Sequence, residues 1–262
     1  MKKLVGSIAL LALSIPFAAQ AADLPPAPAP SYKTPVVVPE VWTWTGCYVG
    51  LHAGGAWSNV QITDVGNAAG LAFDTGFPGT TFSPGNNAAF FGGGQAGCQY
   101  QAGWFVGGLE GDLGWMDLNQ SALEPGNFFG TTVGINSGLY GDITGRLGVA
   151  AGPTLFYAKG GWAWYNGTEN FSTTPASGFI SNSNVSTFNG WVAGAGIEYR
   201  FAPNWTAKVE YLHYAFNSQT FNVTAAGVAG GPFPYTIQPT VDSVKVGVNY
   251  LFNWGGPVSA RY

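Results

Sequence analysis

Hydrophobic and polar residues alternate with a period of two in a series of short segments from about residue 44 onward. Near the end of the chain, Val244, Val246 and Val248 share one face of such a segment, while Lys245 and Asn249 share the other. A period of two is that of a β-strand, in which successive side chains point to opposite faces. The pattern therefore predicts a chain of β-strands, each with one apolar face and one polar face.

Eight segments of about ten residues carry this alternation and are predicted to be strands. They are Trp44–Trp57, Phe90–Gln101, Trp104–Leu118, Leu139–Ala150, Leu155–Tyr165, Asn189–Phe201, Trp205–Phe216 and Asp242–Phe252. The connections are alternately long and short, and the long ones cover 58–89, 119–137, 166–188 and 217–241. Long loops at one rim and tight turns at the other are typical of small outer-membrane barrels. The sequence therefore predicts an all-β fold, an eight-stranded antiparallel up-and-down transmembrane β-barrel with long extracellular loops and short periplasmic turns.

A soluble barrel with an apolar interior would show the same alternation, so other features have to decide. Charges of both signs lie in the middle of the segments, on the polar face. Tryptophans cluster at the segment ends, at Trp44, Trp57, Trp104, Trp115, Trp164, Trp191 and Trp205. Aromatic girdles of this kind lie at the two membrane–water interfaces of a membrane barrel. These features favour a barrel whose apolar face contacts lipid.

The composition is unusual for a soluble protein and excludes two other classes. Only 8% of the 262 residues are charged, against about 25% in a typical soluble domain. Aromatic residues make up 15% of the chain, which argues against disorder. A net charge of −4 with scattered basic residues argues against nucleic-acid binding.

The N-terminus is predicted to be a secretory signal peptide. Lys2 and Lys3 precede the apolar run Leu4–Ala19, and Ala19-Gln20-Ala21 is a small-residue cleavage pattern. The run is shorter than the roughly 20 apolar residues that a spanning helix requires. We therefore expect export through the periplasm and a final location in the outer membrane.

The rest of the chain divides by composition. Six prolines between residues 22 and 43 predict a semi-rigid or disordered periplasmic leader. The predicted organisation is a signal peptide at 1–21, the proline-rich leader at 22–43, the barrel at 44–252 and a C-terminal extension at 253–262. An aromatic residue usually closes the last strand of such barrels, and both Phe252 and Tyr262 are candidates for that role.

Ten charged residues occupy predicted lumen positions. They are Glu110, Asp112, Asp142, Arg146, Lys159, Glu198, Arg200, Lys208, Glu210 and Lys245. The interior of an eight-stranded barrel is only just wide enough for side chains, and charges enclosed there must be paired. We therefore expect a packed salt-bridge network that closes the lumen. The alternative is that these residues serve conduction or gating in a small porin.

The two cysteines are placed so that they can pair. Cys47 lies near the start of the first predicted strand and Cys98 near the end of the second, both on the apolar face and towards the periplasmic rim. Export to an oxidising compartment makes a disulfide plausible. Two free buried thiols are the alternative.

Catalytic and metal-binding patterns are weak. Glu210, His213 and Ser218 contain the residue types of a hydrolase, but Glu210 and His213 have opposite parity and are predicted to face opposite sides of the barrel. The sequence has no Cys and His cluster with the spacing of a metal site. We expect no enzymatic activity, no catalytic residues, and no cofactor or metal.

The predicted outer loops are rich in Asn, Thr, Ser and Gly and contain apolar aromatics. These are Phe73, Phe77, Phe128, Phe129 and Phe179. Loops on a rigid barrel are where binding usually resides, so host surfaces, lipopolysaccharide or another ligand are possible partners. A haem receptor is one alternative, although the loops contain no His for axial ligation.

An ordered series of short motifs resembles a known family. The motifs are Trp44-Thr-Gly-Cys-Tyr-Val-Gly50, Gly92-Gly-Gly-Gln-Ala-Gly97, Val106-Gly-Gly-Leu-Glu-Gly-Asp112, Gly145-Arg-Leu-Gly148, Tyr157-Ala-Lys-Gly-Gly161, Gly194-Ala-Gly-Ile-Glu-Tyr199, Lys208-Val-Glu-Tyr-Leu212 and Lys245-Val-Gly-Val-Asn-Tyr250. Together they resemble the small outer-membrane immunogenic proteins of α-proteobacteria, which are often labelled porin family proteins and look related to the OmpA-type barrel.

The resemblance implies a non-enzymatic outer-membrane barrel with a structural envelope role and surface-exposed loops of an antigen or adhesion type. Some relatives are described as haem-binding. The expected partners are outer-membrane lipids, lipopolysaccharide, the barrel-assembly machinery and host surface ligands, with no nucleic acid. The runner-up functions are a small porin for ions or solutes and a loop-based ligand receptor.

Overall fold

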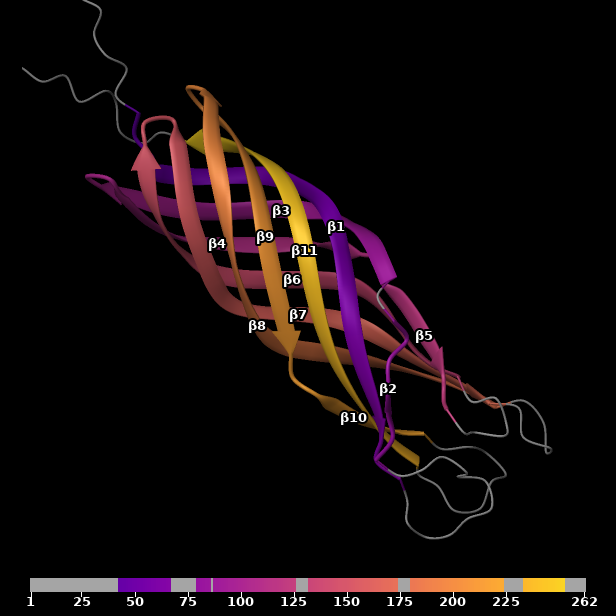
Figure 1. Cartoon of the computed structure of the whole chain (residues 1–262). Helices are drawn as coiled ribbons and strands as arrows, with labels where there is room; N and C mark the ends of the chain where they lie inside the picture. The colour runs from indigo at the N-terminus through magenta and orange to yellow at the C-terminus, as the bar shows by residue number, and fades with distance from the viewer. Residues whose placement is uncertain are drawn as a thin grey trace, which may run out of the picture. The chain divides into compact units, whose positions relative to one another are not determined.

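A computed structural model describes residues 42–66, 79–85, 87–125, 132–173, 180–223 and 233–252, and its strands form a closed barrel (Figure 1). The predicted signal peptide, nearly all of the proline-rich leader, the C-terminal extension and the five loop phenylalanines lie outside the described residues. Among the described residues, the structure has no helix that is long and apolar enough to cross a membrane.

The barrel is a ring of eight antiparallel strands, which confirms the predicted fold class. In ring order these are β1 (Gly46–Asp64), β3 (Asn87–Ala102), β4 (Phe105–Met116), β6 (Thr132–Ala151), β7 (Thr154–Thr173), β8 (Ile180–Ala202), β9 (Trp205–Phe216) and β11 (Phe233–Phe252). Three short strands extend the sheet, namely β2 (Thr81–Phe82) beside β1, β5 (Asn119–Leu123) beside β6 and β10 (Gln219–Val223) beside β11.

The first and last strands of the chain close the ring. β1 pairs with β11 along nearly its whole length, from Cys47 opposite Phe252 to Asp64 opposite Tyr235. Closure matters because lipid cannot hydrogen-bond to the unpaired backbone groups of an open edge.

Three tight turns lie at the end of the barrel where β1 begins and β11 ends, which we call the turn end. They join β3 to β4, β6 to β7, and β8 to β9. Gly103 and Gly152 occupy two of these turns with positive φ angles of 64° and 61°, a region that glycine enters without steric cost. In outer-membrane barrels the end with short turns faces the periplasm.

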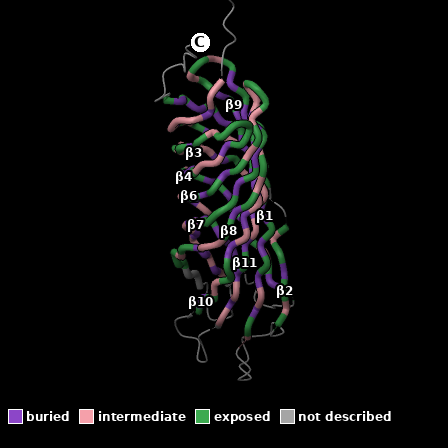
Figure 2. Tube along the Cα trace, turned by 90° about the vertical axis from the view of Figure 1, so that its left-hand side faces the viewer, coloured by how far each residue is buried: buried purple, intermediate pink, exposed green. Residues whose placement is uncertain are grey.

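The outer face carries an apolar belt between two rings of aromatic residues. Leu51 and Leu147 in the belt each expose 74% of their surface, and Figure 2 shows buried and exposed positions alternating along the strands. From Cys47 to Trp57, eleven residues at about 3.3 Å each and a tilt of about 40° span roughly 25–30 Å, close to the height of a hydrocarbon core. The belt therefore fits lipid, as the alternation predicts.

Several strands are longer than the sequence predicts. Parts of the stretches predicted as loops at 58–89, 119–137, 166–188 and 217–241 belong to strands. The reason is that the apolar residues move to the other face of the strand. Val60 and Ile62 on β1 point inward, while the polar residues Asn59, Gln61 and Thr63 point outward. In this outer part of the barrel the apolar face is the inner face, so a pattern with the apolar face outward does not detect it.

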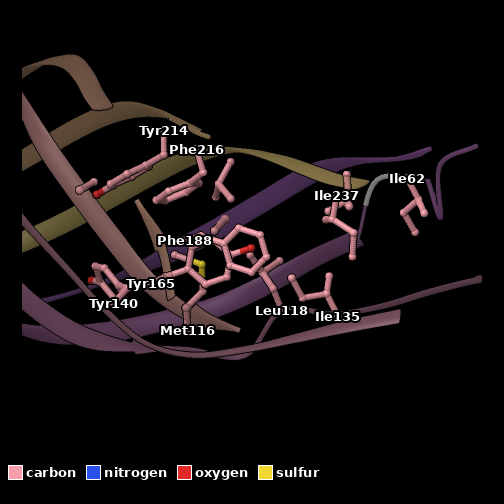
Figure 3. Packing of buried hydrophobic residues seen from close by; sticks show 14 of the residues in the cluster. Ile62, Met116, Leu118, Ile135, Tyr140, Tyr165, Phe188, Tyr214, Phe216 and Ile237 are labelled. Atoms are coloured by element: carbon pink, nitrogen blue, oxygen red, sulfur yellow. The ribbon is translucent and has the colours of Figure 1, made fainter. Parts of the chain in front are cut away.

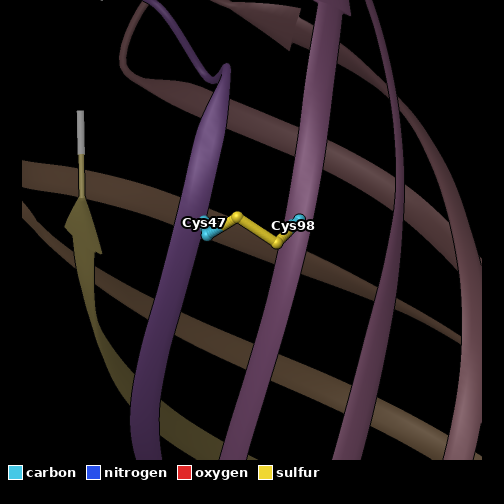
Figure 4. The surroundings of a disulfide bond; sticks show 2 residues. All are labelled: Cys47 and Cys98. Atoms are coloured by element: carbon cyan, nitrogen blue, oxygen red, sulfur yellow. A yellow bond between two sulfur atoms is a disulfide. The ribbon is translucent and has the colours of Figure 1, made fainter. Parts of the chain in front are cut away.

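A disulfide joins the first two strands of the ring (Figure 4). Cys47 on β1 and Cys98 on β3 are register partners, with 3.9 Å between their Cα atoms. They lie on the outward face near the turn end, in phase with Val49 and Tyr100. The pair thus lies on the lipid side, where the sequence places it.

Trp44 is the one predicted girdle residue that the structure places elsewhere. Its side chain is fully buried and packs against Val106, Leu155 and Tyr157. It precedes β1 and shares the parity of Tyr48 and His52, which point inward, so a place in the outer girdle was the wrong expectation.

Candidate functional site

The ten charged residues predicted to line the lumen all point into the barrel. None of them exposes more than 4% of its surface. They come from β4, β6, β7, β8, β9 and β11, so six of the eight strands of the ring contribute a charge. Their burial follows from parity, because they lie on the face opposite to the lipid-facing residues.

Glu110 is surrounded by three cations. Its carboxylate lies 2.6 Å from Nζ of Lys159, 2.8 Å from Nζ of Lys208 and 3.3 Å from Nη1 of Arg146. The hydroxyl of Tyr48 donates to the same carboxylate at 2.6 Å. The two carboxylate oxygens therefore have several charged or polar donors, which is what a buried charge requires.

Glu210 has a similar position on the neighbouring part of the wall. Its carboxylate lies 2.8 Å from Nζ of Lys245, 3.2 Å from Nζ of Lys208 and 3.7 Å from Nζ of Lys159. The Tyr157 hydroxyl donates to it at 2.6 Å. Lys159 and Lys208 thus bridge Glu110 and Glu210.

Two further acids extend these contacts. Asp112 lies 3.0 Å from Nζ of both Lys159 and Lys245, and Glu198 lies 2.6 Å from Nη2 of Arg146. We call the eight connected side chains the charge network. Its members are Glu110, Asp112, Arg146, Lys159, Glu198, Lys208, Glu210 and Lys245. Four acids and four bases leave the network formally neutral.

The remaining two predicted lumen charges lie at its margins. Asp142 accepts a hydrogen bond from the Tyr214 hydroxyl at 3.1 Å, and within the described ranges no cation forms an ion pair with it. Arg200 lies near the turn end and donates from Nε to the Pro203 carbonyl oxygen at 2.9 Å. The expectation that every lumen charge pairs with another therefore fails at Asp142, where a phenol takes the place of a cation.

Neutral side chains on the inner face complete the network, and none of them was among the predicted site residues. His52 contacts Gln95 through Nδ1 and Tyr140 through Nε2, each at 2.6 Å. Asn249 receives a hydrogen bond from Gln95 at 2.6 Å and donates one to Glu198 at 2.9 Å. Their inward parity was the available signal, because polar residues in phase with the lumen charges must face the same interior.

Inward glycines make room for the large side chains. A Cβ atom added to Gly97 would lie 2.5 Å from the Tyr48 hydroxyl, and one added to Gly196 would lie 2.8 Å from the Tyr157 hydroxyl. Real Cβ contacts are longer than this, so both tyrosines depend on the glycine opposite to reach their carboxylates.

The other end of the interior is apolar (Figure 3). Tyr165 lies between Phe188, with 4.9 Å between ring centroids, and Phe216, with 4.7 Å. We call the buried cluster around them the apolar zone. It includes Val60, Ile62, Met116, Leu118, Val133, Ile135, Phe171, Phe188, Phe216, Phe221, Tyr235, Ile237 and Val241. A cavity of about 20 Å³ among these residues has room for about one water molecule.

Two tyrosines form the boundary between the charge network and the apolar zone. The rings of Tyr140 and Tyr214 belong to the apolar cluster, whereas their hydroxyls reach His52 and Asp142 at the edge of the charged region. An amphipathic side chain suits this position because one end is apolar and the other requires a polar partner.

Glu169 is a buried carboxylate on the inner face of β7 beyond the apolar belt. The amide of Asn184 donates to its Oε2 at 3.3 Å. Burial raises the pKa of Glu169 above its ordinary value, since the uncharged form is favoured away from water.

The residues of the weak hydrolase pattern do not come together. Glu210 is buried in the charge network, whereas His213 lies on the outward face and contacts Asp242 at 2.8 Å. The Tyr211 hydroxyl donates to the same Asp242 oxygen at 2.6 Å. Within the part of the chain that the structure describes, no group of three His, Cys, Asp or Glu side chains could hold a metal ion.

Residues 7–252 match the family described as the outer membrane protein β-barrel domain. The chain belongs to this family. Its location is therefore the outer membrane, in agreement with the ring of eight antiparallel strands and the apolar belt.

Relatives of the chain are outer-membrane proteins too. The 25 kDa outer-membrane immunogenic protein of Brucella abortus is 25% identical, and the alignment covers 96% of this chain and all of that protein. The 31 kDa outer-membrane immunogenic protein of Brucella melitensis is 28% identical, over 70% of this chain and 75% of that protein. Among solved structures, the outer membrane protease OmpT of Escherichia coli superposes with a TM-score of 0.50 at 10% identity, covering 79% of this chain and 97% of that one. That likeness concerns the fold alone.

Proposed function

We propose that this outer-membrane barrel is a non-enzymatic envelope protein whose lumen is closed by the charge network. The observation that carries the proposal is the density of contacts around Glu110, which three cations and a phenol enclose. A conducting lumen would hold water around such charges. Here every member of the network is at least 96% buried among other side chains.

The energetics of the network favour closure over gating. Withdrawing a charge from water costs several kcal/mol unless opposite charges and hydrogen bonds compensate for it. Lys159 and Lys208 each contact two or more carboxylates, so moving either one breaks several compensating contacts together. A network of this kind holds its members in place and resists opening a path for solute.

The lack of enzymatic activity is part of the proposal. His213 and Glu210 lie on opposite faces of the wall, which removes the one hydrolase pattern in the sequence. The named relatives are immunogenic proteins of the outer membrane. By extension, the outer segments of this chain face the exterior and act as a surface antigen, with lipid and lipopolysaccharide around the apolar belt.

Conductance across a planar bilayer tests closure. The refolded wild-type protein is compared with Arg146→Ala, in the network, and with Val246→Ala, on the lipid face, as a matched control. We expect no steady current from the wild type or the control, because the charge network and the apolar zone both fill the interior.

A stable wild-type current would overturn the proposal. If the ion selectivity of that current also changed in Arg146→Ala but not in Val246→Ala, the protein would be a small porin with Arg146 on its conduction path. Each variant must be shown to insert into vesicles and to migrate as a folded barrel on unheated gels. The absence of a current can then be attributed to a closed lumen.

A further inference from the structure

The residues just before β1 enter the mouth of the barrel at its turn end. The indole of Trp44 is 0% exposed and packs against Val106 of β4 and Leu155 of β7. In the ring, β7 is the fourth neighbour of β1 in either direction, so it stands directly opposite. A side chain that immediately precedes β1 in sequence yet contacts β7 must reach across the opening.

Hydrogen bonds hold this crossing in place on both sides. The Trp44 backbone N–H donates to Oε1 of Gln101 on β3 at 2.7 Å, and the Gln101 N–H donates to Oγ1 of Thr45 at 3.0 Å. On the far side, Nε1 of Trp44 points to the carbonyl oxygen of Gly152 in the β6–β7 turn at 3.4 Å. The backbone N–H and the indole N–H of Trp44 therefore both have polar partners, as is usual for a buried tryptophan.

Arg200 of β8 forms a third attachment. Its guanidinium hydrogen-bonds to the Thr43 carbonyl oxygen and lies over the ring of Trp42, with 5.5 Å from Cζ to the ring centroid. It also bonds the Pro203 carbonyl oxygen in the β8–β9 turn. This explains why Arg200 lies apart from the charge network, since its donors serve the segment that crosses the mouth.

We propose that Trp42–Thr45 form a plug that closes the turn end of the barrel independently of the charge network. Trp44 fills the opening, Gln101 on β3 and Gly152 in the β6–β7 turn hold it, and Arg200 fastens the backbone. The end with short turns faces the periplasm in this class of barrel, so the plug is a periplasmic closure. It deepens the proposed function by adding a second barrier in series with the first.

A buried reporter cysteine tests the plug without measuring conductance. The chain has two cysteines, and both are in the disulfide, so Val106→Cys adds a single free thiol behind Trp44. Val106 is 2% exposed. The readout is the rate at which a charged, water-soluble methanethiosulfonate labels this thiol in nanodiscs, followed by mass spectrometry.

We expect slow labelling of Val106→Cys and labelling faster by about tenfold or more when Trp44→Ala is added, since the indole is the largest side chain of the buried cluster that contains Val106. Arg200→Gln should give an intermediate rate. Trp104→Ala is the matched control, because Trp104 lies at the same end of the barrel but is 71% exposed on the outer face.

Fast labelling of Val106→Cys with Trp44 present would overturn the plug, and so would equal rates with and without Trp44. Each variant must migrate as a folded barrel before heating, and Trp44→Phe, which keeps a ring in the opening, should restore slow labelling if Trp44→Ala is unstable. The experiment separates the two proposals. A reactive thiol in a barrel that passes no current would refute the plug alone, whereas a current with a protected thiol would refute the closed lumen.

Discussion

The charge network and the apolar zone occupy the same barrel interior with opposite kinds of side chain. At each level, the inner face of the wall also differs in polarity from the outer face. At the level of the network, Leu51 and Leu147 form an apolar outer face while Glu110 and its cations lie inside. At the level of the apolar zone, Asn59 and Gln61 point outward while aromatic and aliphatic side chains lie inside. Where the strands leave the apolar belt, the outer face changes from apolar to polar and the inner face changes from charged to apolar.

The difference shows where each half obtains its stability. A strand in the belt already transfers its outer side chains to lipid, so its interior can be polar provided that its charges are matched. A strand beyond the belt has water outside, and its only means of burying apolar surface is the interior. The first half therefore depends on pairing, and the second on packing.

The largest effect on the free energy of unfolding is expected from removing one charge from the network. Glu110→Gln keeps the shape of the side chain but leaves Arg146, Lys159 and Lys208 with less compensating charge. We expect the free energy of unfolding to fall by about 3–5 kcal/mol, the cost of breaking a buried ion pair from one side. Urea unfolding in phospholipid vesicles, followed by tryptophan fluorescence, measures it. A fall of under about 1 kcal/mol would show that the network does not stabilise the barrel.

A packing change in the other half should have a somewhat smaller effect. Phe188→Ala removes a fully buried ring from its stack on Tyr165, and we expect a loss of about 3 kcal/mol from lost apolar burial and the cavity left behind. The same unfolding assay applies. Val246→Ala is the control, because lipid can fill the space on the outer face. Equal losses for Phe188→Ala and Val246→Ala would mean that the apolar zone is not tightly packed.

The smallest effect should have the opposite sign to the first, although the substitution is the same. Glu169→Gln removes a carboxylate whose pKa burial raises, and ionising that group costs the folded state energy. We expect the variant to be more stable than the wild type by about 1 kcal/mol, the lower end of the cost of an incompletely satisfied buried group.

The pH dependence follows from the same shift in Glu169. A carboxyl whose pKa is raised on folding lowers stability as pH rises above its unfolded value, about 4.3 for Glu. The advantage of Glu169→Gln should therefore be full near pH 8 and vanish towards about pH 4. Unfolding midpoints of both proteins are measured across this pH range. Midpoints that differ by the same amount at every pH, or a variant that is less stable at high pH, would contradict a raised pKa of Glu169.

Much of the membrane-level structure could be predicted from parity. The ten charges lie inside because each alternates with an apolar residue that must face lipid, and Cys47 and Cys98 lie outside for the same reason. Trp44 shares the inward parity of Tyr48, so its assignment to the outer girdle was wrong because it rested on position at a segment end alone. Parity could not show that Asp142 would meet Tyr214 in place of a cation. It also missed the outer parts of the strands, where the apolar face turns inward.

The sequence by itself determined that the chain forms strands, how many form the ring, which face of each meets lipid and which charges lie inside. These properties are local, because they depend on the alternation along one strand and on the lengths of the connections. Only the tertiary structure decided which charge pairs with which, where the interior changes from charged to apolar, and that Trp44 crosses the mouth to β7. Those outcomes depend on the register and closure of eight strands, which bring together residues up to about two hundred positions apart in the chain.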